Sequence, residues 1–368
     1  MLKSRGFWLG IAVSAILIGW FLYGEKNSFD DIKTAFQDAN YAIALASLPV
    51  YFAGLWLRTI RWQYLLRPVK KVSTIRLYPV VIIGLMANNL IPARAGELAR
   101  AYVLGQRERI SKTAALGTIA VDRLFDGVTL IPILLIVAAL AGGDATFPVG
   151  FGKSLSFLGL GITMAVLFGA AITMLFYFAL SANGQRQLHW LVHRFAPGRL
   201  KPKVDYLLNS FIDGLRALRN PLDLTFALMM SVGSWLLEAT MYYIVGIAFS
   251  VHEPFYVFLL LTAASNLAIA IVASQGGIGP FELVVSKTLI AFGVTAELST
   301  AYAIGLHAIL LFPVIVLGLY LMWSMKLTFG DIMKTSQDDA EAQPVNAHDA
   351  AGRMTVAAQP AVEGSGRK

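Results

Sequence analysis

The sequence predicts an all-α polytopic membrane protein, and three observations support this fold class. Hydrophobic residues make up 57% of the chain and charged residues only 14%, a composition that soluble domains rarely have. Six apolar runs are long enough to cross a hydrocarbon core about 30 Å thick, which takes about 20 helical residues. Two further apolar segments are shorter and are broken by proline and glycine. We therefore expect about six full transmembrane helices plus two re-entrant helical hairpins.

The predicted spans are residues 6–23, 40–57, 114–140, 154–180, 223–250 and 298–323. The first run follows two basic residues, as a signal peptide would, but it is long and ends in bulky aromatic residues without a small-residue cleavage site. We interpret it as an uncleaved anchor. Residues 1–325 are predicted to form one integral membrane domain. Residues 326–368 lose the apolar periodicity and are rich in Ala, Gln, Asp and Gly, which predicts a disordered cytoplasmic tail.

Basic residues near the span ends predict the orientation. The segment from Arg58 to Arg76 holds six basic residues and no acid, and residues 181–222 hold seven basic residues against two acids. Residues 24–40 hold four acids against two lysines. Because basic loops are retained on the cytoplasmic side, we expect a cell (inner or plasma) membrane protein with both termini in the cytoplasm. The net charge of +8 follows from this topology and from attraction to anionic lipid, so no nucleic-acid partner is expected.

The sequence lacks the residues that several kinds of chemistry need. The chain has no cysteine, which excludes disulfides, thiolate metal sites and cysteine nucleophiles. No nucleotide-binding motif is present, and no cofactor is expected. His189 and His193 are four residues apart and could share a metal, but no glutamate follows His189 and the surrounding segment is basic. A solvated amphipathic helix is the favoured interpretation, and no metal site is predicted.

The two short segments fit the topology if each enters the membrane and turns back. About fifteen largely apolar residues run from Leu77 to Ile91 before Pro92, and basic segments flank them on both sides. The second segment runs from Phe255, breaks at QGGIGPFE (275–282) and resumes to about Gly293, with short flanks that are not basic. One hairpin would enter from the cytoplasm and one from outside. Their broken tips would lie near mid-depth, where irregular backbone is tolerated only inside protein or along a cavity.

The two tips also resemble each other. Each has a polar start, a proline, a glycine and then a glutamate followed by leucine, at Gly96-Glu97-Leu98 and at Phe281-Glu282-Leu283. This similarity suggests an inverted repeat, an arrangement that places ligand sites between broken helices at the midplane. The alternative is coincidence, because proline and an acid are ordinary at any helix N-terminus.

The first tip, NNLIPARAGELAR (88–100), concentrates charge in an apolar chain. A charged side chain facing lipid at the bilayer centre would cost on the order of 3 kcal/mol, so these charges should face protein, water or a bound head group. Helix starts at the two prolines would attract anions, and the arginines suit phosphate oxygens. The alternative is an Arg-Glu-Arg network that only ties the loop to its neighbours. The predicted site residues here are Asn88, Asn89, Pro92, Arg94, Gly96, Glu97 and Arg100.

The span that follows carries a second charged motif, AVDRLFDG (120–127). Asp122 and Asp126 are four residues apart, hence on one helix face, with Arg123 beside them. We expect either aspartate to pair with an arginine of the first tip, and Arg123 to pair with Glu97. Structural pairing is favoured over a role as proton carriers.

Further candidates lie in the C-terminal half. Glu238 sits midway along its span, where an unpaired carboxylate is costly, and a coupling or substrate role is predicted for it. Lys287, five residues beyond Glu282, is a candidate partner for Glu238 or for a head group. The glycines of QGGIGPFE lack the lysine and hydroxyl residue of a phosphate loop, so a helix break or close backbone approach explains them better. They are Gly276, Gly277 and Gly279.

In this order and spacing, the three motifs resemble a flippase-like membrane family related to the transmembrane region of lysylphosphatidylglycerol synthases, over roughly residues 5–325. Family members with a C-terminal aminoacyl-transfer domain make an aminoacylated lipid, and their membrane part moves it between leaflets. The resemblance thus implies lipid translocation without lipid synthesis, and some subgroups are associated with hopanoid or glycosylated-polyprenol pathways. The site residues that this resemblance implies are Asn89, Pro92, Arg94, Gly96, Glu97, Arg100, Asp122, Arg123, Asp126, Gly276, Gly277, Gly279 and Glu282.

Three hypotheses for function follow. The first is a lipid flippase or transporter, not an enzyme, that moves a polar, anionic or phosphate-bearing lipid through a charged cavity, either downhill or driven by protons or membrane potential. The second is an intramembrane transferase with Glu97 or Asp122 as general base. The third is a non-transporting partner of a separate lipid-biosynthesis enzyme. Membrane lipids are the expected partners in each case.

Overall fold

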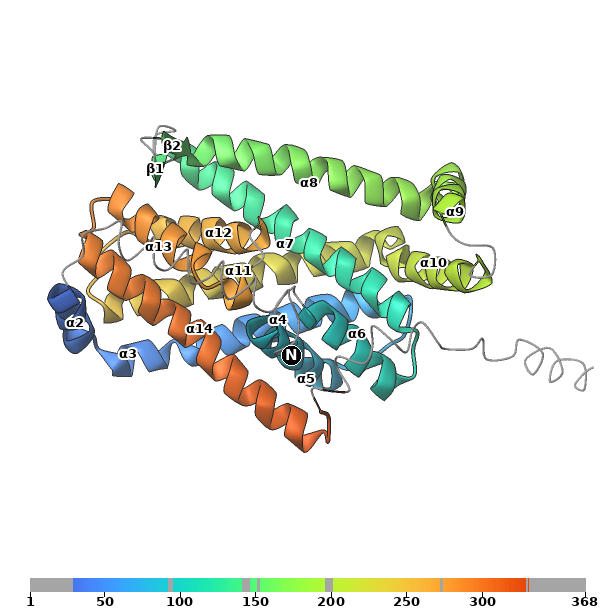
Figure 1. Ribbon diagram of the computed structural model, residues 1–368, viewed down its shortest axis with the longest axis horizontal. Helices are drawn as coiled ribbons and strands as arrows, with labels where there is room; N and C mark the ends of the chain where they lie inside the picture. The colour runs from blue at the N-terminus through green and yellow to red at the C-terminus, as the bar shows by residue number, and fades with distance from the viewer. Residues whose placement is uncertain are drawn as a thin grey trace, which may run out of the picture.

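The computed structural model describes residues 29–91, 95–140, 146–150, 153–195, 201–271, 274–328 and 330. These residues are almost entirely helical, as predicted, with one small antiparallel strand pair (Figure 1). The elements are α2 (Phe29–Asp38), α3 (Tyr41–Ala46), α4 (Leu48–Leu66), α5 (Thr74–Leu90), α6 (Ala95–Glu108), α7 (Lys112–Leu140), β1 (Thr146–Gly150), β2 (Lys153–Ser156), α8 (Phe157–Leu180), α9 (Ala182–Phe195), α10 (Lys201–Leu215), η2 (Arg216–Arg219), α11 (Pro221–Ala248), α12 (Phe255–Ile271), η3 (Gln275–Gly277), α13 (Pro280–Ala291) and α14 (Ala296–Ser324).

Long apolar helices confirm five of the six predicted spans. The first predicted span, 6–23, lies outside the described residues, as do Pro92, Arg94 and most of the predicted tail. The helices long and apolar enough to cross a membrane are Tyr41–Leu66, Lys112–Leu140, Phe157–Phe178, Pro221–Ala248 and Ala296–Ser324. The chain is therefore a multi-pass membrane protein.

Helix α4 extends beyond the prediction. The second span was expected to end at residue 57, with Arg58 and Arg61 in a cytoplasmic loop, but α4 continues to Leu66 and both arginines are buried within it. The loop assignment of these two residues was wrong. Acidic side chains from other helices neutralise them, and a hydropathy pattern read along one segment does not show such partners.

Helices α5 and α6 form the first predicted hairpin. They lie against each other so closely that a Cβ built on Gly84 would be 2.3 Å from Cγ of Arg100. The backbone N–H of Gly96 donates to Oδ1 of Asn88 at 2.7 Å, which ties the start of α6 to the end of α5. Neither helix has the length of about 20 residues that a full crossing needs.

Helices α12 and α13 form the second hairpin, with η3 at its tip. Three glycines of the tip have positive φ, at +62° for Gly276, +78° for Gly277 and +99° for Gly279, a region that disfavours residues with a Cβ. The helix break predicted from QGGIGPFE is thus confirmed. The tips of the two hairpins meet, because Nε2 of Gln275 donates to the carbonyl of Leu90 at 3.0 Å.

The order of elements repeats along the chain. A span, a hairpin and a span occur as α4, α5–α6 and α7, and again as α11, α12–α13 and α14. In Figure 1, α2 and the strand pair lie at one end of the long axis, and α9 and α10 lie at the other. This order suits an inverted repeat, which stays a prediction.

Close helix contacts fix the centre of the protein. Helices α4 and α11 approach at Gly54, where a Cβ would lie 3.3 Å from the carbonyl of Ser234. Helices α7 and α10 cross where a Cβ on Gly214 would lie 2.3 Å from the carbonyl of Ala114. By contrast, α8 exposes Ile162, Val166 and other large apolar side chains, as a lipid-facing helix does.

Candidate functional site

A cluster of buried and partly buried charges lies where α4, α6, α7 and α11 pack together. We call it the arginine–carboxylate cluster and define it by Arg58, Arg61, Glu97, Arg100, Asp122, Arg123, Asp126 and Glu238. Four of its members are cationic and four are anionic, so the cluster is balanced at neutral pH. Arg94, predicted to belong here, lies outside the described residues.

Asp122 is the centre of the cluster and is completely buried. Its Oδ1 accepts from Nε of Arg61 at 2.8 Å, and its Oδ2 accepts from Nη1 of Arg100 at 3.0 Å. Nη2 of Arg123 lies 3.7 Å from the same Oδ2. The expected pairing of an AVDRLFDG aspartate with an arginine of the first tip is therefore confirmed for Arg100.

Asp126 extends the network by one helical turn, as the four-residue spacing predicts. It accepts from Nη1 of Arg61 at 2.8 Å and forms an ion pair with Nη1 of Arg123 at 2.9 Å. Nε of Arg123 also lies 3.9 Å from Oε1 of Glu97, which confirms the predicted partner of Glu97. These contacts join the start of α6 to α7.

Glu238 has partners on both α4 and α12. Its Oε2 accepts from Nη2 of Arg58 at 3.0 Å, and its Oε1 accepts from Nδ2 of Asn266 at 2.9 Å. The long span α4 supplies this cation, which sequence reasoning had placed in a loop. Lys287, proposed as a partner, lies on α13 and is half-buried.

Several cluster atoms have no hydrogen-bond partner among the described residues. The guanidinium atoms are Nε of Arg58, Nη2 of Arg61, Nε of Arg100 and Nε of Arg123. Oε2 of Glu97 is also buried without a partner in the described part of the chain. A buried donor without an acceptor lowers the stability of the fold by about 1–3 kcal/mol, and by more when the group is charged. The cluster thus holds N–H groups that an anionic ligand can satisfy.

Aromatic rings support two arginines of the cluster. The guanidinium of Arg100 lies 4.1 Å from the ring centroid of Trp62, and that of Arg58 lies 4.3 Å from Trp235. Such stacking stabilises a cation without using its N–H donors. Nε1 of Trp62 donates to Oγ1 of Thr118 at 3.1 Å, which fixes the ring.

Polar contacts follow the seam between α4 and α11 from the cluster toward one end of the protein. Next to the Arg58–Glu238 pair, Nη1 of Arg61 donates to Oγ of Ser231 at 2.9 Å. Nη1 of Arg67 then donates to Oδ1 of Asp223 at 2.7 Å. The two helices run antiparallel here, because the partner numbers fall on α11 as they rise on α4.

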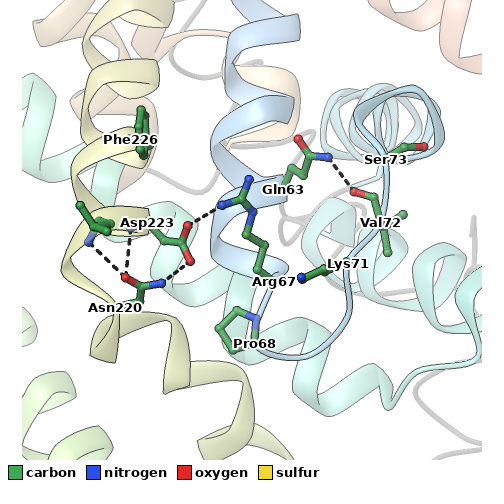
Figure 2. Close-up of a pocket in the computed structure, with 10 residues that line it drawn as sticks. Gln63, Arg67, Pro68, Lys71, Val72, Ser73, Asn220, Asp223 and Phe226 are labelled. Atoms are coloured by element: carbon green, nitrogen blue, oxygen red, sulfur yellow. Dashed lines mark hydrogen bonds and ion pairs between the residues drawn. The ribbon is translucent and has the colours of Figure 1, made fainter.

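A cavity of about 810 Å³ opens at the end of this seam (Figure 2). Arg67 and Lys71 contribute positive charge to its lining, and Asn220 donates to Asp223 at 2.7 Å. Phe226, partly exposed on α11, also lines it. The cavity therefore joins a basic wall to an apolar helix face, at the end where the basic segments predict the cytoplasm.

Glu282 and its partner lie at the second tip. Oε2 of Glu282 accepts from the backbone N–H of Gly279 at 2.7 Å and so caps its own helix. Its Oε1 lies 2.6 Å from Nδ1 of His307 on α14. Sequence reasoning missed His307, and the signal that could have found it is a lone ionisable residue inside an apolar span.

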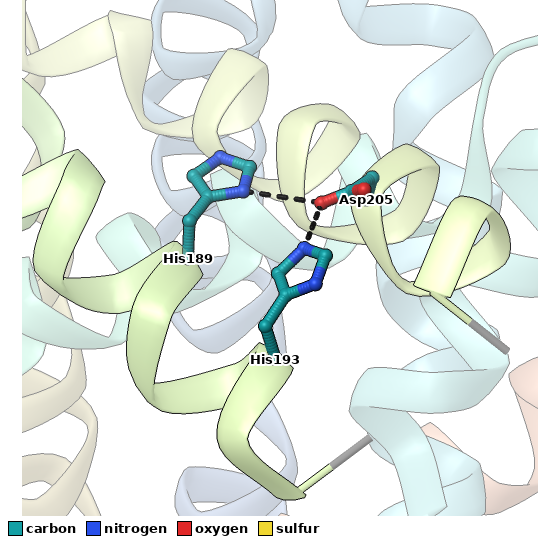
Figure 3. Close-up of side chains that lie close together, drawn as sticks. All are labelled: His189, His193 and Asp205. Carbon is teal, nitrogen blue, oxygen red and sulfur yellow. Dashed lines mark hydrogen bonds and ion pairs between the residues drawn. The ribbon is translucent and has the colours of Figure 1, made fainter. Parts of the chain in front are cut away.

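The two neighbouring histidines of α9 contact α10 (Figure 3). Nδ1 of His189 and Nε2 of His193 lie 3.2 Å and 2.6 Å from Oδ1 of Asp205. Hydrogen bonding, above all from His193, holds the pKa of Asp205 below its ordinary value. Their ligand atoms lie within 4.8 Å of one another and are of the type that zinc accepts. All three side chains are partly exposed, outside the arginine–carboxylate cluster.

The fold and the site define a multi-pass membrane protein with a charged site buried between its spans and hairpins. The family model described as lysylphosphatidylglycerol synthase TM region matches residues 7–318, and the chain belongs to this family. The resemblance carried by the three motifs is thereby confirmed.

Two curated relatives show the range of the family. A UPF0104 membrane protein of Methanothermobacter thermautotrophicus is 26% identical over 282 residues, which cover 74% of this chain and 82% of that protein. Glycosyltransferase AglD of Haloferax volcanii is 23% identical over 334 residues, which cover 84% of this chain and 53% of that protein. The chain thus spans about half the length of AglD. No solved structure matches the chain.

Proposed function

We propose that this protein moves a lipid with a phosphate-bearing head group between the two leaflets of the membrane. One observation carries the proposal: the arginine–carboxylate cluster keeps buried guanidinium N–H groups without partners in the described part of the chain. Guanidinium groups bind phosphate oxygens through paired, charge-assisted hydrogen bonds. The resemblance to the membrane part of lipid-moving synthases agrees with this chemistry.

The seam between α4 and α11 supplies a route for the head group. The cavity at Arg67 and Lys71 is the entrance, beside an apolar helix face along which lipid tails stay in the bilayer. From Arg67 to Arg58 is nine residues of helix, or about 14 Å. Arginine side chains along that distance let the head group pass from one cation to the next. Its desolvation is offset at each step, because a charged partner replaces water.

The cluster can present one arginine to an anion while Asp122 keeps another cation as its partner. Arg100 shares Asp122 with Arg61, so it can turn toward a phosphate while Asp122 keeps a cation at 2.8 Å. Its ring contact with Trp62 stays available during this exchange. Arg100 is therefore the residue that we assign to head-group contact.

Translocation of labelled lipids in proteoliposomes tests the proposal. Arg100→Gln should lower the rate at least tenfold for lipids with a phosphate head group, which corresponds to about 1.4 kcal/mol. Arg100→Lys keeps the charge but loses the planar fork, and should give an intermediate rate. Arg216→Gln is the matched control, because this exposed arginine lies outside the arginine–carboxylate cluster and forms an ion pair with nearby Asp213 at 3.0 Å. Equal rates for wild type and Arg100→Gln across several head groups would refute the site.

A second candidate is a lipid-modifying transferase, which the match to a glycosyltransferase favours. Asp122 is held by Arg61 and Arg100 and is a poor base. Glu97 is the better one, since its Oε2 has no hydrogen-bond partner among the described residues. A lipid whose mass changes in membranes with the wild type but not with Glu97→Gln would support this activity. Unchanged lipid masses with active translocation would exclude it.

A further inference from the structure

His307 on α14 holds the tip of the second hairpin at two points. Its Nδ1 lies 2.6 Å from Oε1 of Glu282, and its Nε2 lies 3.0 Å from the carbonyl oxygen of Gly276. Both side chains are buried, His307 at 4% and Glu282 at 8% exposure. The histidine thus connects α14 to the loop at η3 and to the start of α13.

The two contacts require one proton more than a neutral imidazole and a carboxylate provide together. The carbonyl of Gly276 can only accept, so Nε2 of His307 must carry a hydrogen. The contact between Nδ1 and Oε1 then needs a second proton, on His307 or on Glu282, because two lone pairs would otherwise face each other at 2.6 Å. Oε2 of Glu282 is already used as acceptor by Gly279.

Few other ionisable groups face this pair in the described residues. The ring of Phe281 lies 4.3 Å from that of His307, and Phe281 in turn contacts Tyr242 of α11. Tyr302 lies on α14 and donates to the carbonyl of Tyr242 at 2.9 Å. From α5, the backbone carbonyl of Asn89 approaches Gly276 of the tip. The extra proton is therefore shared between His307 and Glu282, the two titratable groups in direct contact.

Loss of the proton must break one of the two contacts. If the remaining hydrogen stays on Nε2, the histidine repels Glu282; if it moves to Nδ1, the carbonyl of Gly276 loses its donor. Either way α14 releases one anchor of the tip. The tip contacts the first hairpin, since a Cβ on Gly276 would lie only 3.2 Å from the carbonyl of Asn89. The released tip therefore changes the contact between the two hairpins.

We propose that His307 and Glu282 form a proton-binding site whose occupancy controls the attachment of the second hairpin tip to α14. As the coupling site for lipid movement it rests on the proposed function, because the first hairpin carries Arg100. The proton itself is the ligand, and it leaves to water when the tip detaches. The pair is thereby a coupling device at the junction of the hairpins.

Hydrogen exchange of the purified protein in lipid nanodiscs, measured over a series of pH values, tests the site without any transport assay. After correction for the intrinsic pH dependence of exchange, the peptide that covers 274–283 should exchange up to about tenfold faster per pH unit where the pair loses its proton. The double variant His307→Gln/Glu282→Gln has neither group that can take up the proton and should remove this dependence. His252→Gln, at an exposed loop position, is the control and should behave as wild type.

The outcomes separate the proton site from the proposed function. Corrected exchange at 274–283 that does not vary with pH in the wild type overturns the site, even if the double variant fails to fold. Persistence of the pH dependence in His307→Gln/Glu282→Gln also overturns it. Translocation in liposomes with an imposed pH gradient then tests coupling: active translocation that ignores the gradient overturns coupling while the proposed function stands. Pronounced pH-dependent exchange without translocation supports the proton site and refutes the proposed function.

Discussion

Replacing Asp122 by asparagine removes the centre of the arginine–carboxylate cluster while keeping its shape. Two guanidinium groups contact its oxygens at 2.8 and 3.0 Å. At about 4 Å between charge centres and an effective dielectric constant of about 20, each attraction is about 4 kcal/mol, which mostly offsets the desolvation of the ions. The substitution leaves four arginines against three carboxylates. Because an uncompensated buried charge costs about 3–5 kcal/mol, we expect a loss of that size in the free energy of unfolding.

Reversible unfolding in mixed detergent micelles measures this loss, and a double-mutant cycle assigns its cause. Asp122→Asn with Arg100→Gln restores the charge balance, so the double variant should be more stable than the sum of the single changes predicts, by about 2 kcal/mol. Asp213→Asn, which breaks an exposed pair with Arg216, should cost at most about 1 kcal/mol. Additive effects in the cycle, or a loss below about 1 kcal/mol for Asp122→Asn, would refute the role of charge balance.

Two further predictions concern the tip and the protein's pH dependence. Gly276→Ala should lower the free energy of unfolding by about 1–2 kcal/mol through backbone strain, and should also slow translocation by displacing the hairpins. Gly293 also has a positive φ but has nothing within 4 Å of a built Cβ, so Gly293→Ala should cost only the strain. Equal translocation rates for the two variants would contradict the role of the tip contact. Hydrogen bonding from Lys70 holds the pKa of Glu108 below its ordinary value, so this carboxylate stabilises the fold at neutral pH and the contribution is lost as pH falls below about 5. In Glu108→Gln the melting temperature should therefore fall less steeply with decreasing pH than it does in the wild type. An unchanged dependence on pH would count against this contribution of Glu108.

The hairpins and much of the charged site were predictable because their signals are local. Proline and glycine interrupt apolar sequence at both tips, and Asp122 and Asp126 share a helix face by their spacing alone. Arg100 as partner of Asp122 followed from the expense of unpaired charge in the membrane. These inferences require only the principle that a polar group buried without a partner is energetically costly.

The missed residues depend on contacts between distant parts of the chain. Arg61 and Asp122 are 61 residues apart, and Arg58 and Glu238 are 180 residues apart. Charges at the end of an apolar run are read as the start of a loop unless their partners are known. A clue was available, since Arg58 and Arg61 are three residues apart and continue one face of the preceding helix.

The two halves of the chain hold their hairpins with different chemistry at comparable places. Glu97 is the third residue of α6 and Glu282 is the third residue of α13, and each hairpin is tied to the span that follows it. In the first half the tie includes Arg100 and Asp122, and arginine keeps its charge at every physiological pH. In the second half the tie is His307 with Glu282, and the two contacts of this histidine depend on one shared proton. Under the proposal, proton loss acts on the tie of the second hairpin and leaves the Arg100–Asp122 tie of the first hairpin in place. Because the tips are in contact, loss of the proton would shift the second hairpin relative to the first, as the proposed coupling of proton binding to lipid movement requires.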